Sequence, residues 1–148
     1  MLTRKARYAV KALMFIAKNQ KDSQLVPVSL ISKEEKIPYK FLEAILADLK
    51  AGGIVGSKKG ASGGYFLSRA PEKIVLTEII RISNGPIAMI PCVSLNYYQP
   101  CEDCPNEQMC SLHLVLTEVR DATLAIFSRT SIKDLVDIES KPISQKDK

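Results

Sequence analysis

Residues 28–68 place two short helical segments directly before a glycine-rich, basic hairpin, and this order narrows the choice of fold. From Pro38 to Ala51 the apolar residues fall at helical spacing, and two glycines follow. A shorter helix is expected before Pro38, with Ser29 as its N-cap and Ser32 as the alternative cap. Two helices joined by a tight connection, the second entered through a proline, are typical of a helix-turn-helix.

The hairpin that follows has short strand candidates at residues 54–57 and 65–68. Its tip holds Lys58, Lys59 and several glycines, which let the backbone approach another molecule closely. A helix-turn-helix followed by a basic hairpin predicts a winged helix, mainly α with a small β wing. In this fold the second helix of the motif can enter the major groove of DNA, and the wing can lie along phosphates.

Charge is spread unevenly along the chain. Residues 1–73 hold 14 Lys and Arg against 6 Asp and Glu, whereas residues 74–148 hold 7 against 10. A basic first half favours a polyanionic partner such as nucleic acid, and a lysine-rich solvated surface is the alternative.

The first segment, residues 5–18, shows the wide apolar face of an amphipathic helix. Basic residues before an apolar stretch also begin signal peptides, but Lys11 and Lys18 interrupt this stretch and no small-residue cleavage site follows. No apolar run approaches the roughly 20 residues that a membrane span needs. We therefore expect a cytoplasmic protein without a membrane partner.

After residue 73 the pattern changes to separate helices around a polar loop. One helix is expected up to Asn84 with Thr77 as its N-cap, a long one over 111–127, and a last one over 131–138. The long helix carries more apolar surface than one small domain can cover, which predicts a dimerisation helix. The alternative is that it packs only on its own chain. We divide the chain into a winged helix at 1–73, a loop and dimerisation region at 74–138, and a disordered tail at 139–148.

All four cysteines and the single histidine lie between Cys92 and His113. In a cytoplasmic protein such a cluster indicates metal or redox chemistry rather than a structural disulfide. Cys101 and Cys104 have the spacing of half a zinc site, which Cys110 or His113 can complete. The same pair can instead close a regulatory disulfide.

An iron–sulfur cluster is the third interpretation, because it needs several thiolates on a loop and accepts an imidazole in place of one. Cys110 and His113 are three residues apart at the start of the long helix, on one face and at the end that favours negative charge. A thiol enzyme using these two residues is not expected, because no group that would orient the base is readable.

Taken in order, these segments resemble the IscR and NsrR type of regulator, the Rrf-two family of winged-helix transcription factors. The matching stretches are "RYAVKALMFIA", "LISKEEKIPYKFLEAILADLKAGGIVGSKKGASGGYFLSR", "LTEIIR" and "CEDCPNEQMCSLHLVLTEVRDATLAIFSRTSIKDLV". The resemblance implies a homodimer that binds a double-stranded operator as a repressor and senses iron–sulfur or redox status through a cluster of the [2Fe–2S] type. A regulator without a cluster, switched by zinc, a disulfide or a partner protein at the same cysteines, is the alternative.

The resemblance also assigns the site residues. The metal ligands it implies are Cys92, Cys104, Cys110 and His113, with Cys101 as the substitute ligand, because Cys101 is extra to the family pattern. Lys40 and Lys59 can contact phosphate or guanine, and Glu43 can accept from cytosine. Core packing is the alternative role of Phe41. The DNA-binding residues implied are Arg4, Lys5, Arg7, Ser29, Pro38, Tyr39, Lys40, Phe41, Glu43, Lys58, Lys59 and Gly60.

Overall fold

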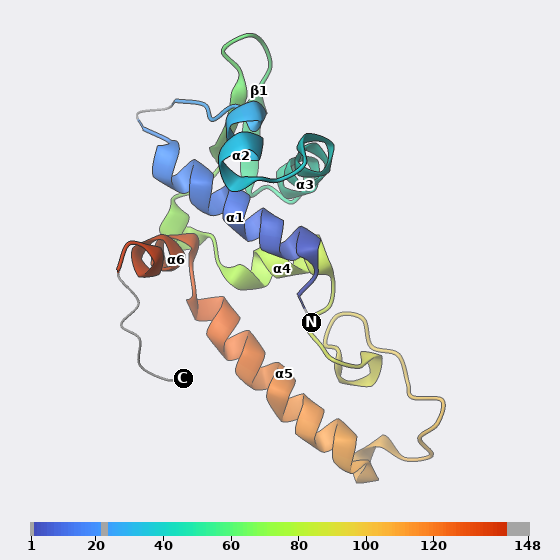
Figure 1. Cartoon of the computed structure of the whole chain (residues 1–148). Coiled ribbons are helices and arrows are strands. Elements are labelled where there is room, and N and C mark those ends of the chain that lie inside the picture. The colour runs from blue at the N-terminus through green and yellow to red at the C-terminus, as the bar shows by residue number, and fades with distance from the viewer. Residues whose placement is uncertain (1, 22–23, 142–148) are drawn as a thin grey trace.

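The structure, a computed structural model, describes residues 2–21 and 24–141. It is mainly helical with one two-stranded antiparallel sheet, which confirms the predicted fold class (Figure 1). The elements are α1 (Arg4–Asn19), α2 (Val28–Glu35), α3 (Tyr39–Ala51), β1 (Val55–Lys58), β2 (Gly64–Leu67), α4 (Leu76–Asn84), α5 (Ser111–Arg129) and α6 (Ile132–Glu139), with short 3-10 turns η1 (Pro71–Lys73), η2 (Pro91–Val93) and η3 (Glu107–Met109).

Helix α1 lies at the centre of the core and packs against α2, α3, α4 and α6. Its inward face is completely buried and carries three alanines, so neighbouring helices can come close to its backbone. The buried residues of this face are Ala6, Ala9, Ala12, Leu13 and Ile16. The hydroxyl of Thr3 caps the helix by accepting the Ala6 N–H at 3.1 Å.

The turn between α2 and α3 is set by Lys36, whose backbone is left-handed with φ 53° and ψ 43°. The Ser32 hydroxyl donates to the Ile37 carbonyl at 2.6 Å and closes this turn. The expected N-cap role of Ser29 or Ser32 is therefore wrong. Pro27 occupies the cap position, so α2 already includes Ser29, and Ser32 bonds near the opposite end of the helix.

The wing is anchored to the segment that enters α2. Strands β1 and β2 pair antiparallel from Val55 opposite Leu67 to Lys58 opposite Gly64. Tyr65 also exchanges two backbone hydrogen bonds of 2.9 Å with Val26. A side chain at Gly64 would meet the Val26 main chain at 2.6 Å, so this approach requires glycine.

The second half of the chain returns to the same core. Ile74, Ile79 and Ile132 are buried in the cluster that also contains the α1 face. Helices α4 and α6 both pack against α1, and a short backbone bridge joins Val75 to Ser131, the residues that precede them. The division at residue 73 stays a prediction, and the hydrophobic core runs across it.

Helix α5 extends away from this core, as Figure 1 shows, and none of its described side chains is buried. Helix α6 then begins after Ser131, which forms a capping box with Asp134. This start agrees with the helix predicted over 131–138. The expected tail begins at Glu139, which is the last residue of α6, and its residues 142–148 lie outside the described residues.

The expected N-cap of α4 is also wrong. Val75 occupies the cap position, so Thr77 lies inside the first turn, where it is buried. Its hydroxyl oxygen has no hydrogen-bond partner among the described residues. A buried hydroxyl without a partner lowers the stability of the folded state.

We expect Thr77→Val to raise the free energy of unfolding by about 1 kcal/mol, because valine keeps the shape and removes the unpaired hydroxyl. Urea denaturation measures the difference. The matched control is Ser83→Ala on the same helix, whose hydroxyl donates to the Ile79 carbonyl at 2.6 Å, so its removal should not stabilise. A Thr77→Val protein less stable than the wild type would contradict the assignment.

Candidate DNA interface and cysteine loop

An open groove lies between the start of α2, the first turns of α3 and the wing. It brings together six of the residues predicted to bind DNA: Ser29, Tyr39, Glu43, Lys58, Lys59 and Gly60. Lys40 stands beside the groove with 95% of its side chain exposed and its ammonium 4.0 Å from the Glu43 carboxylate. Such an array of cations and polar groups around a concave surface can receive a nucleic-acid backbone.

Pro38 and Phe41 lie outside this groove. Pro38 is the N-cap of α3 rather than part of its first turn. The Phe41 ring packs edge-to-face on Tyr8 of α1 with 5.7 Å between ring centres, while 36% of the residue remains exposed. Phe41 therefore joins α3 to α1 at the surface and is not part of the buried core, and its contact with DNA stays a prediction.

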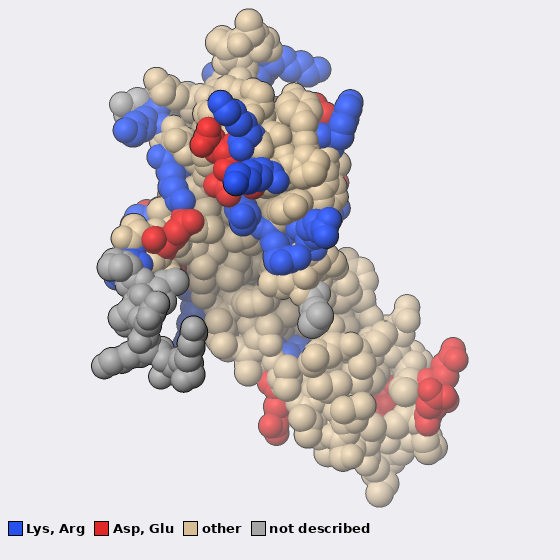
Figure 2. Space-filling view, in the orientation of Figure 1, with Lys and Arg blue, Asp and Glu red and all other residues tan. Residues whose placement is uncertain are grey.

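The three basic residues in the first turn of α1 form a separate group. Arg4 and Arg7 are exposed, whereas the Lys5 ammonium pairs with the Asp48 carboxylate of α3 at 2.6 Å. Figure 2 shows Lys and Arg side chains spread over the winged-helix part of the molecule, while the end that carries the cysteine loop shows mainly acidic charge. On this face, basic side chains thus gather on the winged-helix part, where some acidic side chains lie among them.

Two groove residues were missed by the sequence reasoning. Lys50 lines the groove and donates to the Ser57 hydroxyl at 2.7 Å, joining α3 to the wing. It is two helical turns after Glu43, so the helical period could have placed it on this face. Tyr65 also lines the groove, where burial and the nearby Glu43 carboxylate raise the pKa of its phenol and keep it protonated.

The cysteine loop, residues 85–110, joins α4 to α5 and arranges its thiols in different environments. Cys92 is 8% exposed within η2, Cys101 is exposed, and Cys104 and Cys110 are half-buried. Burial, reinforced by the Glu107 carboxylate, raises the pKa of the Cys92 thiol.

The thiols of Cys104 and Cys110 lie close enough to shift each other's pKa, and the Cys104 thiol also donates to the Asn106 carbonyl at 4.0 Å. The bond to Cys110, together with burial, raises the pKa of Cys104 to about 11. The His113 backbone N–H, followed by the Cys104 thiol, donates to the Cys110 sulfur and lowers the pKa of Cys110. Cys110 is the N-cap of α5, so the helix terminus favours its thiolate.

Glu107 holds the middle of the loop. Its carboxylate accepts the Cys101 backbone N–H at 3.1 Å and the Tyr98 hydroxyl at 3.0 Å. The Cys101 carbonyl in turn accepts the Cys104 N–H at 3.4 Å. This carboxylate was not singled out from the sequence, because its role depends on how the loop folds back on itself.

The predicted ligands share one end of the molecule, but they do not surround a common point. Within residues 2–21 and 24–141, no three His, Cys, Asp or Glu side chains are close enough to hold a metal ion. The half-buried His113 ring has a buried Nδ1 without a hydrogen-bond partner in these residues. Soft thiolates and an unpaired imidazole fit an iron–sulfur group chemically, provided that Cys92 or Cys101 moves toward the Cys104–Cys110 pair.

A winged helix with a basic groove defines a helix-turn-helix DNA-binding regulator. Residues 2–138 match the family described as "Rrf2: Iron-dependent Transcriptional regulator". The chain therefore belongs to the Rrf2 family, as the sequence resemblance predicted, and it is a transcriptional regulator rather than an enzyme.

Relatives and solved structures agree with this assignment. The chain is 39% identical over 138 residues to a putative rrf2-like transcriptional regulator of Rhodobacter capsulatus, covering 92% of each chain. It is 30% identical over 135 residues to IscR of Photorhabdus laumondii, covering 91% of this chain and 78% of the relative. The structure of CymR, the global cysteine regulator of B. subtilis, superposes with a TM-score of 0.75 at 25% identity, covering 93% of this chain and 97% of CymR.

In the part of the chain that the structure describes, no helix combines the length and the apolar character needed to span a membrane.

We expect the thiols of the metal-free protein to react with iodoacetamide at different pH values. Cys110 should become reactive at a lower pH than an ordinary thiol, because its pKa is lowered, and Cys104 should need a pH near 11. Peptide mass spectrometry at a series of pH values separates the two sites.

Cys104→Ala is the matched variant for this experiment. It removes the thiol that donates to Cys110 and should move the Cys110 midpoint only partly upward, because the His113 N–H remains. Equal midpoints for Cys104 and Cys110 in the wild type would contradict the thiol pair.

Proposed function

We propose that the chain is a cytoplasmic, homodimeric repressor that reads an operator with its groove and senses iron–sulfur or redox status through a cluster bound at the cysteine loop. The observation that carries the sensing role is that Cys104, Cys110 and an unpartnered His113 imidazole gather at the start of α5. Membership in a family described as iron-dependent supports it. The proposed ligands are Cys92, Cys104, Cys110 and His113, with Cys101 as the substitute.

Reading of an operator is assigned to the groove and to α1. In each subunit α3 enters a major groove, Lys40 and Lys59 contact phosphate or guanine, and Glu43 accepts from cytosine. Arg4 and Arg7 bind backbone phosphates and set the register. Two subunits then cover successive major grooves of a pseudo-palindromic site.

Dimerisation is assigned to α5. Four exposed apolar residues repeat along it at spacings of three, four and seven: Leu112, Val115, Val119 and Ile126. This is the stripe of a helix that packs against another helix. A second copy of the chain offers the same stripe, so a two-fold symmetric contact buries both.

A physical route connects the cysteine loop to the DNA-binding residues. Residues 85–91 join Cys92 directly to Asn84 at the end of α4. The Asn84 side chain accepts the Thr3 N–H at 2.8 Å, next to Arg4 on α1. When bound, an iron–sulfur group supplies iron that responds to oxidants and to iron supply. Movement of Cys92 toward the Cys104–Cys110 pair pulls on residues 85–91, and through them on Asn84 and α1.

The proposal is tested by anaerobic purification, followed by a visible absorption spectrum and assays of iron, sulfide and zinc. We expect iron and sulfide in the wild type and their loss in Cys92→Ala and Cys110→Ala. Cys101→Ala and Cys104→Ala, measured side by side, identify the remaining thiolate. A colourless protein without iron after attempted reconstitution would contradict the cluster.

A regulator switched by a disulfide is the second candidate, and the contact between Cys104 and Cys110 favours it. The disulfide expected from the sequence joined Cys101 to Cys104, but the thiol beside Cys104 is that of Cys110. Mass spectrometry of the peroxide-treated, metal-free protein distinguishes the two pairings.

We expect Lys59→Gln to weaken binding to a mixed-sequence DNA duplex and to reduce the magnitude of the salt slope by about 1, because one phosphate contact is lost. Fluorescence anisotropy at several salt concentrations measures the slope. Lys73→Gln is the control, because Lys73 is an exposed lysine of η1 outside the groove. Equal slopes for both variants would remove Lys59 from the interface.

We expect Val115→Asp to convert the dimer to a monomer, because a carboxylate would be buried in the α5 stripe without a partner. Light scattering coupled to size exclusion gives the mass. Ser128→Asp adds the same charge at an exposed position of α5 away from the stripe, and this variant should remain dimeric. A Val115→Asp protein that stays dimeric would exclude this stripe as the interface.

A further inference from the structure

The buried turn that carries Cys92 is held by an arginine of α5. The Arg120 Nη1 donates to the Val93 carbonyl at 2.6 Å. The same guanidinium pairs with Asp121, with 2.7 Å from Nη2 and 2.8 Å from Nε to the carboxylate. Only 13% of the Arg120 side chain is exposed. A cation this well buried is stabilised by both partners, and its loss leaves the Val93 carbonyl without this donor.

This contact links two parts of the molecule that are otherwise joined by apolar packing. Among the hydrogen bonds of the described residues, it is the only one between residues 85–109 and α5. The other hydrogen bonds of η2 stay within residues 90–99, with the Val93 N–H on Ile90, the Ser94 N–H on Pro91 and the Gln99 N–H also on Pro91 at 3.4 Å. The turn is therefore hydrogen-bonded within its own segment, and Arg120 adds the hydrogen bond that fixes it to α5.

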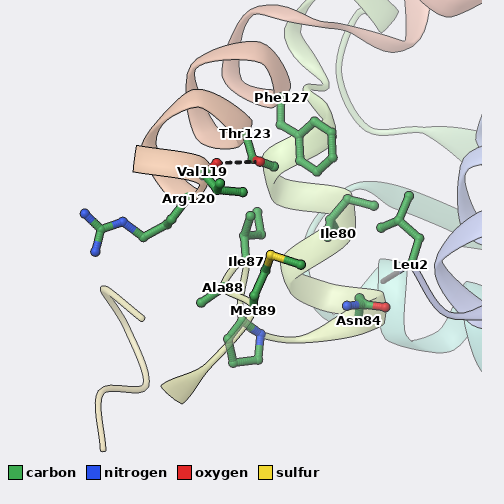
Figure 3. Close-up of a pocket in the computed structure, with 11 residues that line it drawn as sticks. Leu2, Ile80, Asn84, Ile87, Ala88, Met89, Val119, Arg120, Thr123 and Phe127 are labelled. Atoms are coloured by element: carbon green, nitrogen blue, oxygen red, sulfur yellow. Dashed lines mark hydrogen bonds between the residues drawn. The ribbon is translucent and has the colours of Figure 1, made fainter. Parts of the chain in front are cut away.

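Figure 3 shows how the arginine is directed. It leaves α5 beside Val119 and points away from the apolar side chains of the pocket. Ile87 and Met89, from the segment just before the turn, line the pocket, where Ile87 is half-buried and Met89 is exposed. Apolar contact at Ile87 and the hydrogen bond from Arg120 therefore act on either side of Cys92.

We infer that Arg120 is a positioning residue that fixes the Cys92 turn on α5 and so sets the place from which Cys92 reaches the other cysteines. The role toward a cluster rests on the proposed function, whereas the restraint on Cys92 does not. Arg120 lies on α5, which also carries Val115 and Val119 of the apolar stripe. A displacement of Cys92 is therefore transmitted through Arg120 to the helix assigned to dimerisation.

An arginine suits this position better than a lysine. Its planar fork serves the Val93 carbonyl and the Asp121 carboxylate at the same time, with separate N–H groups. A lysine at this position keeps the charge but loses the fork. Arg120→Lys should therefore restore part of what Arg120→Gln loses, which a role in bulk stability alone would not predict.

The test uses the full-length, metal-free protein and measures the rate at which iodoacetamide labels each cysteine, resolved by peptide mass spectrometry. We expect Arg120→Gln to speed labelling of Cys92 about tenfold, the effect of losing one charge-assisted hydrogen bond on the opening of the turn. Labelling of Cys101, Cys104 and Cys110 should stay close to wild type. Arg129→Gln, an exposed arginine at the end of the same helix, is the control and should match the wild type at all four sites.

Two results would overturn the inference. One is unchanged Cys92 labelling in Arg120→Gln. The other is an equal rise at all four cysteines, which would show general loosening rather than positioning. If the reconstituted wild type holds iron, a chelator should remove it about tenfold faster from Arg120→Gln and at an intermediate rate from Arg120→Lys. If the wild type holds none, the cluster proposal fails, and the labelling pattern still decides the role of Arg120.

Discussion

The architecture depends on the buried face of α1. Its alanines and Leu13 let α3 approach from one side and α4 and α6 from another, so a single helix is shared by the DNA-binding unit and the elements that flank the long arm. A larger side chain at Ala9 or Ala12 would have to displace one of these helices, because the packing leaves no exposed surface there. The winged helix is consequently not an independent block, and what happens at α4 reaches α1 directly.

Because α1 is shared in this way, the cysteine loop is connected at both of its ends to helices of the folded molecule. Its first half leaves α4 at Asn84, which is bonded to Thr3, and its last residue caps α5. Arg120 connects the Cys92 turn to α5 through its hydrogen bond to the Val93 carbonyl. A change in the distance between Cys92 and the Cys104–Cys110 pair is therefore resisted at both ends. An allosteric signal requires only that the resulting arrangement of α1 and α5 binds DNA differently.

The fold could be predicted from the sequence wherever the spacing of apolar residues agreed with the glycines and prolines that end helices and strands. The apolar stripe of α3, the two glycines after it and the lysines at the hairpin tip define a winged helix before any coordinates are known. Local caps were less predictable, because Pro27 and Val75 took positions where Ser29 and Thr77 were expected. Those choices depend on tertiary packing, which buries Thr77 and moves each helix start.

The cysteine site could be located from the sequence, but its internal geometry could not. The sequence shows that the thiols and His113 lie in one segment. The proximity of Cys104 to Cys110 and the hydrogen bonds that Glu107 accepts from Tyr98 and Cys101 depend on the path of the loop. Arg120 is separated from Val93 by 27 positions in the sequence and belongs to no motif. Only the fold reveals that it reaches the residue after Cys92.

The central claim is that the state of the cysteine loop is transmitted to the DNA-binding residues through α4 and α1. It is tested most directly by the ratio of dissociation constants of the iron-loaded and the metal-free protein for one duplex selected by the protein from a random pool. We predict a ratio of at least about fivefold for the wild type, and a ratio close to one for Asn84→Ala, which lacks the bond to Thr3. A wild-type ratio of one, or an unchanged ratio in Asn84→Ala, would contradict the account.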